Sequence, residues 1–334
     1  AELLKNHFFS RDDVDAYSNT WLPIFEMDEE TLAYWNTSIA AGRYQRSYVD
    51  LFFDALLQIK VHDGTRQVSA AHKEMYAKVS DLFRSYKHFL KHYEIPKPEI
   101  IREIGEYAAL FKKFVDPTVL DHELSGSPGP ERVVAISLGL ETTTLIPYVL
   151  FVLKNIQDED DRDELFQVLE AYVMRRKVCR SENKNYNQLF ADQLVGNRIL
   201  TASDLISFLR DKQGTTEQIP DDSQLKRGFH ESVLTNKQAA GVLYLIESAT
   251  RSASLQSTAL LGMGRYSLEH VMPKKWRNNW HGVPSEEAAA QRDKKLLTLG
   301  NLTIIQSSLN SSIRDADWAT KIAGRSGING LNQY

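Results

Sequence analysis

Residues 267–273 read Ser-Leu-Glu-His-Val-Met-Pro, and this stretch decides the fold of the C-terminal part of the chain. Two further stretches belong with it, Leu-Gly-Asn-Leu-Thr-Ile-Ile at residues 299–305 and Leu-Asn-Ser-Ser at residues 309–312. Apolar and β-branched residues bounded by glycine and proline predict two short strands, Tyr266 to Met272 and Leu302 to Ile305. The first of these strands carries a histidine near its end, and an asparagine stands just before the second.

Helices are predicted between and after these strands. Residues 285–297 begin with a serine and two glutamates and continue into alanines and basic residues, which is typical of a capped helix. Residues 315–323 show a second helical pattern. The predicted order is strand, helical insert, strand and helix, a small α+β domain.

The polar residues of these stretches have the chemistry to hydrolyse a phosphodiester. This reaction needs a nucleophilic water and a cation that neutralises the phosphate and stabilises the leaving oxygen. Glu269 and Asn310 offer hard oxygens that suit Mg²⁺ or Mn²⁺. His270 offers a neutral imidazole that can act as general base. Asn301 can hydrogen-bond the loop that carries His270 and so fix its orientation.

These residues also have structural interpretations. Glu269 could be a salt-bridged strand residue, Asn301 could simply form a turn after Gly300, and Asn310 could belong to a helix start or a turn. Consecutive residues on a regular strand face opposite ways, so Glu269 and His270 share a site only if the strand twists or bulges before Pro273. The assignment of His270 is therefore firmer than that of Glu269.

This ordered set of residues resembles the His-Me finger nucleases, also called HNH or ββα-metal nucleases. Within them it is similar to the C-terminal nuclease domain of GmrSD-type modification-dependent restriction enzymes. The residues that carry the resemblance are 269–273, 299–305, 310–313, Trp318 and Lys321. The resemblance implies a general base at His270, a loop brace at Asn301, and metal ligands at Glu269 and Asn310. It also implies an Mg²⁺- or Mn²⁺-dependent DNA endonuclease or nickase that acts in defence against foreign DNA, modified DNA included.

A weaker resemblance extends upstream. Residues 3–9 look like the end of the N-terminal nucleotide-dependent domain of such enzymes, and residues 172–179 look like a helix of their middle region. The Asp-Gly-Gln-Gln-Arg motif expected of the NTP-hydrolysing part does not occur in the chain. We therefore expect that an N-terminal NTP-hydrolysing domain is missing from this chain.

Composition places the chain among ordinary globular proteins. It has 334 residues, of which 42% are hydrophobic and 25% charged. No apolar run is long enough to span a bilayer, and the N-terminus lacks the layout of a signal peptide. The single cysteine, Cys179, excludes an internal disulfide framework and a cysteine-based zinc site. A cytoplasmic location without a membrane partner is the expectation.

Positive charge collects at the C-terminal end of the chain. Residues 251–334 hold 11 Lys and Arg and 6 Asp and Glu, a balance of +5, against -9 for the remainder. A positive surface suits a phosphate-bearing substrate, although chance clustering on a solvated face would give the same balance. The residues predicted to bind substrate are Lys274, Lys275, Arg277 and Lys321. Trp276 and Trp280 lie among them and could stack a base or close a loop over the core.

Residues 1–255 are predicted to form a helical domain and residues 256–334 the nuclease domain. Apolar residues three and four positions apart give the clearest helices, and these cover residues 48–61, 70–93, 99–114, 131–138, 144–155, 161–178 and 235–250. The predicted fold class is mainly α, a multi-helix domain followed by a small α+β His-Me finger (ββα-metal) nuclease domain.

Two clusters in the helical region each have two interpretations. His88 and His92 are four residues apart on a predicted helix and could bind a metal, but no third ligand is visible in the sequence, which favours a structural role. The basic residues Arg175, Arg176, Lys177 and Arg180 suit either a helix C-terminus or a DNA backbone.

Two alternatives to an active DNA nuclease stay open. A catalytically inactive nuclease-fold module that binds DNA or regulates another domain is favoured by the overall acidity of the chain. The presence of His270, Asn301 and Asn310 together disfavours it. The second alternative is an RNase of the same fold, which only a panel of substrates can distinguish.

Overall fold

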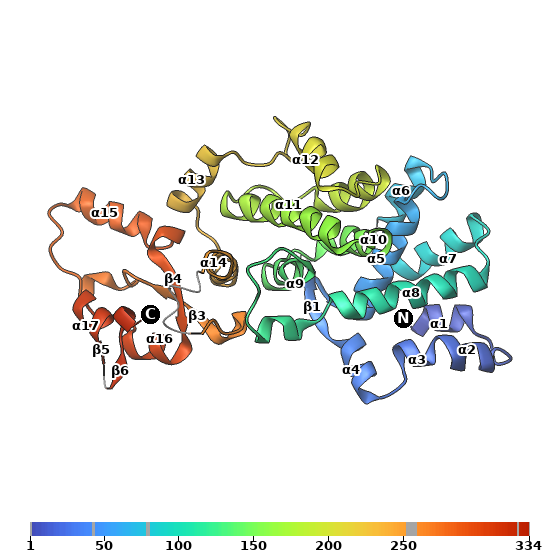
Figure 1. Cartoon of the computed structure of the whole chain (residues 1–334), viewed down its shortest axis with the longest axis horizontal. Coiled ribbons are helices and arrows are strands. Elements are labelled where there is room, and N and C mark those ends of the chain that lie inside the picture. Colours follow the sequence, from blue (N-terminus) through green and yellow to red (C-terminus); the bar gives the residue numbers. More distant parts are fainter. Residues whose placement is uncertain (1, 42–43, 78–80, 252–258, 326, 334) are drawn as a thin grey trace. The chain divides into compact units, whose positions relative to one another are not determined.

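The computed structural model describes residues 2–41, 44–77, 81–251, 259–325 and 327–333. Most of these residues lie in helices, and the strands among them form small two-stranded antiparallel sheets (Figure 1). The predicted class, mainly α with a small α+β C-terminal part, is confirmed. None of the helices in the described part of the chain has the length and apolar content required to cross a membrane.

Residue contacts divide the chain into two compact units. The first unit consists of Ala1–Asp116, Glu141–Arg162 and Lys184–Leu205. The second unit consists of Pro117–Leu140, Asp163–Asn183 and Ile206–Tyr334. The domain boundary predicted between residues 255 and 256 falls within residues 252–258, which lie outside the described residues. That boundary stays a prediction.

Helix α5 (Tyr48–His62) forms the centre of the first unit. The Ser47 side chain caps its N-terminus by accepting a hydrogen bond from the backbone N–H of Asp50. Most of its length is buried, including the rings of Phe52 and Phe53. The helices that pack against α5 are α4 (Glu29–Asn36), α6 (Ala70–Tyr76), α7 (Leu82–His92), α8 (Lys97–Phe114) and α10 (Ile146–Asn155). The predicted helices at residues 48–61, 99–114 and 144–155 are confirmed to within a few residues.

Short elements precede α5. They are α1 (Glu2–Phe8), α2 (Val14–Thr20), α3 (Leu22–Phe25) and the hairpin of β1 (Ser38–Ala41) and β2 (Tyr44–Ser47). In this hairpin Ser38 lies opposite Ser47. Sequence periodicity predicted only helices in this region, because four-residue strands are too short to show an alternating pattern.

The single helix predicted over residues 70–93 is wrong. Helix α6 ends at Tyr76 and α7 begins at Leu82, with Asp81 at the N-cap position. The Asp81 backbone is not in the α-helical conformation, and its side chain makes no capping hydrogen bond to α7. The two helices pack against each other. The break therefore brings residues of α6 beside residues of α7.

The second unit contains several helices before its C-terminal strands. They are α9 (Pro130–Val134), α13 (Asp222–Glu231) and α14 (Asn236–Thr250). A π-helical turn over Ala135–Gly139 continues α9. Two further helices, α11 (Glu159–Val178) and α12 (Ala202–Arg210), have residues in both units. Arg132 of α9 donates to both carboxylate oxygens of Glu170 at 2.8 and 2.6 Å, and to the Leu245 carbonyl at 3.0 Å. This buried guanidinium therefore joins α9, α11 and α14.

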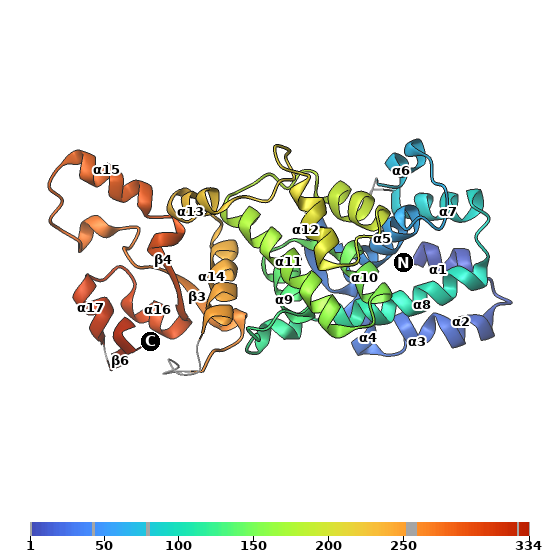
Figure 2. The ribbon, with the colours of Figure 1, turned by 45° about the horizontal axis from the view of Figure 1, so that its top comes forward.

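The strand pair predicted from sequence is confirmed. Strand β3 (Tyr266–His270) pairs antiparallel with β4 (Leu302–Gln306), with His270 opposite Leu302. Helix α16 (Ser307–Ile313) follows β4 directly and packs against both strands, and all three lie together in two views (Figure 1, Figure 2). Leu309 and Ile313 of α16 bury their side chains with Ile305 of β4. The result is a β-β-α unit with a long insert between its strands.

The two helices predicted for the insert and the C-terminal end are confirmed to within a few residues, whereas α16 between them was not predicted. Helix α15 (Glu286–Lys295) is capped by Ser285, whose hydroxyl accepts from the backbone N–H of Ala288 at 3.2 Å. Helix α17 (Trp318–Ala323) is capped by Asp317 and starts three residues later than predicted. A minimal hairpin of β5 (Gly324–Arg325) and β6 (Ile328–Asn329), which was not predicted, follows α17.

Candidate active site

His270 is the last residue of β3, and Asn301 holds the chain directly after it. The Asn301 carboxamide accepts a hydrogen bond from the backbone N–H of Met272 at 2.8 Å and donates to the Met272 carbonyl at 2.9 Å. It also donates to the Leu296 carbonyl at 2.9 Å, and its own backbone carbonyl accepts from Val271 N–H at 2.9 Å. The carboxamide thus fixes the chain that leaves His270, which is the geometry a loop brace needs.

The imidazole of His270 is half-buried. Burial lowers the pKa of His270 to about 4, and the nearby positive charges of Lys274 and Lys321 act in the same direction. The ring is consequently neutral at physiological pH. A neutral imidazole is the form that can accept a proton from water.

Asn310 reaches β3 from α16. Its amide nitrogen donates a hydrogen bond to the carbonyl of Leu268 at 3.2 Å. This bond uses the nitrogen of the carboxamide, so the oxygen of the same group is the atom that could bind a cation. Ser307, at the start of α16, places its hydroxyl 2.7 Å from that of Ser267, which further ties α16 to β3.

Glu269 and Lys321 form a buried ion pair. The Glu269 side chain is 6% exposed, that of Lys321 is 0% exposed, and the Lys321 ammonium contacts the Glu269 carboxylate. The same ammonium donates to the backbone carbonyl of His270 at 2.8 Å. Burial raises the pKa of the Glu269 carboxyl, although Lys321 favours its charged form. This geometry favours a structural part for both residues over the ligand and phosphate-contact roles suggested by sequence, which stay predictions.

The basic residues after Pro273 differ in what they contact. Lys274 and Lys275 are exposed. Arg277 is exposed but forms a double hydrogen bond with Asp293 of α15, at 3.0 and 2.7 Å. Trp276 is buried and donates to the same carboxylate at 2.9 Å. For Trp276 the structure favours a loop closed over the core, because a buried indole is not available to stack a nucleotide base.

Trp280 also belongs to this closed loop. Its indole N–H donates to the Ala316 carbonyl at 2.9 Å, and its ring meets that of Trp318 edge to face with centroids 6.0 Å apart. Trp318 itself is 48% exposed. The aromatic residues therefore connect the insert to α17, a role that the sequence pattern did not separate from base stacking.

Two arginines of the basic cluster on α11 hold a loop of their own unit. Arg176 is buried and donates to the Gln218 carbonyl at 2.8 Å, and Arg175 donates to the Pro220 carbonyl at 3.0 Å and to Asp222 at 2.6 Å. These contacts favour the helix C-terminus interpretation over DNA binding for Arg175 and Arg176. Gln218, Pro220 and Asp222 lie more than forty positions away along the chain, so no local pattern could reveal these partners.

A cavity of about 540 Å³ in the first unit contains none of the predicted site residues. Charged side chains line it, but they contact one another. Arg46 bonds Asp54 at 3.1 Å, while His62 and Lys73 lie 2.9 and 3.0 Å from Asp192. Glu74 and Lys184 also line the cavity, and no residue of the proposed nuclease site reaches it.

An antiparallel strand pair that ends in a histidine and leads into a helix bearing an asparagine is now established in this part of the chain. A comparison with known families covers the same residues. Residues 219–328 match the family of GmrSD restriction endonucleases, C-terminal domain. This part of the chain is therefore a restriction-endonuclease C-terminal domain of the GmrSD type, and the predicted resemblance is confirmed. No curated protein and no solved structure matches the chain.

Proposed function

We propose that the domain is a metal-dependent DNA endonuclease or nickase in which His270 is the general base. The observation that carries the proposal is the half-buried imidazole at the end of β3, with Asn301 bracing the residues after it and Asn310 beside β3. A phosphodiester bound there would present its scissile phosphate to a water that His270 can deprotonate. The family match supports nuclease activity. The positions of His270, Asn301 and Asn310 support the particular mechanism proposed here.

The side chains present fit a hard divalent cation. Mg²⁺ usually keeps several waters and takes only one or two protein oxygens together with phosphate oxygens. The Asn310 carboxamide oxygen can supply one of these protein oxygens. When bound, Mg²⁺ or Mn²⁺ would neutralise the phosphate and stabilise the leaving oxygen. Glu269 would be a second ligand only if its ion pair with Lys321 opened.

In this mechanism the ion pair has a positioning role. The Lys321 ammonium bonds both the Glu269 carboxylate and the His270 carbonyl, so it fixes the backbone from which the imidazole projects. Asn301 fixes the next two residues. The backbone that carries the imidazole is therefore fixed at His270 and at the two residues after it before substrate arrives, and this positioning favours general-base catalysis.

The proposed substrate is DNA, in modified form or not, within a defence system of restriction type. The exposed Lys274 and Lys275 follow His270 closely and can contact the phosphate backbone. The helical region would position substrate or relay signals from an NTP-hydrolysing domain outside this chain. A cytoplasmic location fits a nuclease that meets incoming DNA.

Plasmid cleavage with a His270→Ala variant tests this proposal. The wild-type chain should nick or cut plasmid DNA with Mg²⁺ or Mn²⁺ and lose this activity with EDTA. His270→Ala should abolish cleavage without changing the far-ultraviolet circular dichroism spectrum. His281→Ala, which alters another histidine of the same region, should cleave normally. Cleavage retained by His270→Ala would overturn the role of His270, whereas RNA cleavage alone would support the RNase alternative.

An inactive regulatory module would behave differently. It would cleave no nucleic acid with any divalent cation, yet it could still bind DNA. Measuring DNA binding and cleavage on the same preparation therefore separates the two functions. Binding without cleavage in the wild-type chain would refute the enzymatic proposal.

A further inference from the structure

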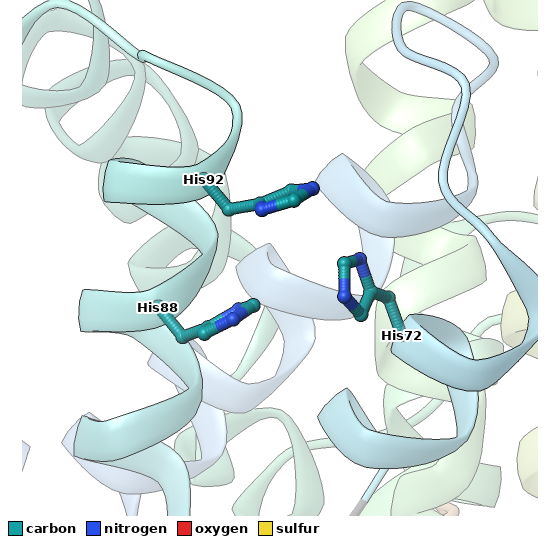
Figure 3. Close-up of side chains that lie close together, drawn as sticks. All are labelled: His72, His88 and His92. Atoms are coloured by element: carbon teal, nitrogen blue, oxygen red, sulfur yellow. The ribbon is translucent and has the colours of Figure 1, made fainter.

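Three histidines converge in the first unit, between α6 and α7. His88 and His92 lie one helical turn apart on α7, and His72 of α6 faces them (Figure 3). One ring nitrogen from each histidine lies within 4.8 Å of the other two. The sequence showed only the pair on α7, because the break after Tyr76 is what places His72 opposite them.

The three rings form a contact cluster of their own. The rings of His88 and His92 are stacked, with an interplanar angle of 10° and centroids 5.4 Å apart. The ring of His72 stands nearly perpendicular to both, at 5.2 Å from His88 and 4.5 Å from His92. None of the three histidines is buried. An ion from solvent can therefore reach them.

Two tyrosines orient the rings in the way that metal ligands need. The Nδ1 atom of His72 lies 2.9 Å from the Tyr93 hydroxyl, and Nδ1 of His88 lies 2.8 Å from the Tyr76 hydroxyl. When Nδ1–H donates to such an oxygen, Nε2 carries the free lone pair. Histidines that bind metals typically make a hydrogen bond of this kind with their other nitrogen.

We propose that His72, His88 and His92 form a binding site for a divalent transition-metal ion of the zinc type. Imidazole nitrogens suit Zn²⁺, Co²⁺, Ni²⁺ and Cu²⁺, whereas Mg²⁺ prefers oxygen ligands. The site is thus chemically distinct from the hard-cation site proposed beside His270. A zinc–nitrogen bond of about 2.0–2.1 Å requires the rings to draw closer by small side-chain rotations.

The site would tie α6 to α7. Helix α6 spans seven residues, and helices of this length are marginal without tertiary support. Three ligands from two helices would fix the packing of one against the other. With three protein nitrogens the fourth position of a tetrahedral ion stays open to water or to an added ligand.

Zinc titration of the chain in the His270→Ala background tests the proposal, because that background removes the imidazole of the nuclease site. Isothermal titration calorimetry with ZnCl₂, after EDTA treatment and dialysis, should show one tight site per chain. His88→Gln or His92→Gln should abolish that site, and Tyr93→Phe should weaken it by about 10-fold. His281→Gln is the matched control and should bind zinc as before. MgCl₂ should give no heat attributable to this site.

Two further readouts complete the test. Co²⁺ should produce visible absorption bands typical of tetrahedral nitrogen coordination, and these bands should disappear in His88→Gln. Zinc should raise the melting temperature of the parent chain but not of His88→Gln. The proposal would be overturned if the His270→Ala chain bound no zinc. It would also be overturned if adding His88→Gln or His92→Gln left zinc binding unchanged.

Discussion

Replacing Lys321 by methionine separates a structural ion pair from a contact to substrate. Methionine keeps much of the apolar length of the lysine side chain but removes its charge. The Glu269 carboxylate, 6% exposed, is then left without its counter-charge. Removing one partner of a buried pair typically destabilises a protein by about 3–5 kcal/mol. The loss should appear first in the β3–β4 strand pair, since Glu269 lies on β3.

Protonation of Glu269 sets an upper limit to the stability that Lys321→Met loses. A carboxyl with an ordinary pKa of 4.5 is charged in the unfolded chain, and its neutralisation in the folded chain at pH 7 requires about 3.4 kcal/mol. At pH 5 the same step requires only about 0.7 kcal/mol. Burial raises the folded-state pKa of Glu269, so the folded variant binds a proton that the unfolded chain does not. The stability of Lys321→Met therefore falls as pH rises from 5 to 7.

Hydrogen exchange followed by mass spectrometry measures this effect locally. Peptides covering β3 and β4 should lose about 3 kcal/mol of protection at pH 7 and less than about 1 kcal/mol at pH 5. Lys294→Met, on the exposed face of α15, is the matched control and should change little. Adding Glu269→Gln to Lys321→Met should remove the pH dependence. Unchanged protection in Lys321→Met, together with lost DNA cleavage, would refute the structural role and favour a phosphate contact.

Three other perturbations follow from contacts described above. The pKa of about 4 at His270 predicts that cleavage persists below pH 6 and declines only as pH approaches about 4. A pH–rate profile that declines around pH 6.5 would contradict this prediction. Asn301→Ala removes three hydrogen bonds to the backbone of Met272 and Leu296, so kcat should fall by about 100-fold while the Kd for DNA changes little; an unchanged kcat would rule out the brace. Arg132→Met leaves Glu170 without its partner and should lower the free energy of unfolding by about 3–5 kcal/mol in urea titrations; a loss under about 1 kcal/mol would mean that water replaces the pair.

Local signals in the sequence were sufficient for the elements around the site. The cap at Ser285 and the acidic start and basic end of its helix predicted α15 nearly to the residue. Apolar and β-branched residues bounded by glycine and proline also predicted the strand pair. Such signals succeed because capping and strand alternation act over a few neighbouring residues.

Long-range pairs were not predictable in the same way. Glu269 meets Lys321 across 52 positions, and nothing near either residue indicates its partner. The His72 cluster depends on a turn in a segment whose apolar periodicity predicted one continuous helix. In both cases the tertiary arrangement, rather than residue propensity, decides which side chains meet.

The packing of α14 against β3 and β4 has a practical consequence for producing the C-terminal domain as a separate fragment. A fragment that starts at residue 256 would lack α14 and would expose to solvent the face of β3 and β4 that packs against α14. The backbone bridge between Val233 and Thr298, and the bond from Lys295 to the His230 carbonyl, would be lost as well. A fragment that starts near residue 219, where the family match begins, keeps α14 beneath the strands. It still lacks Pro117–Leu140 and Asp163–Asn183 of the same compact unit, including Arg132, which bonds the Leu245 carbonyl of α14. The intact second unit, rather than the family-matched range alone, is therefore expected to stay folded.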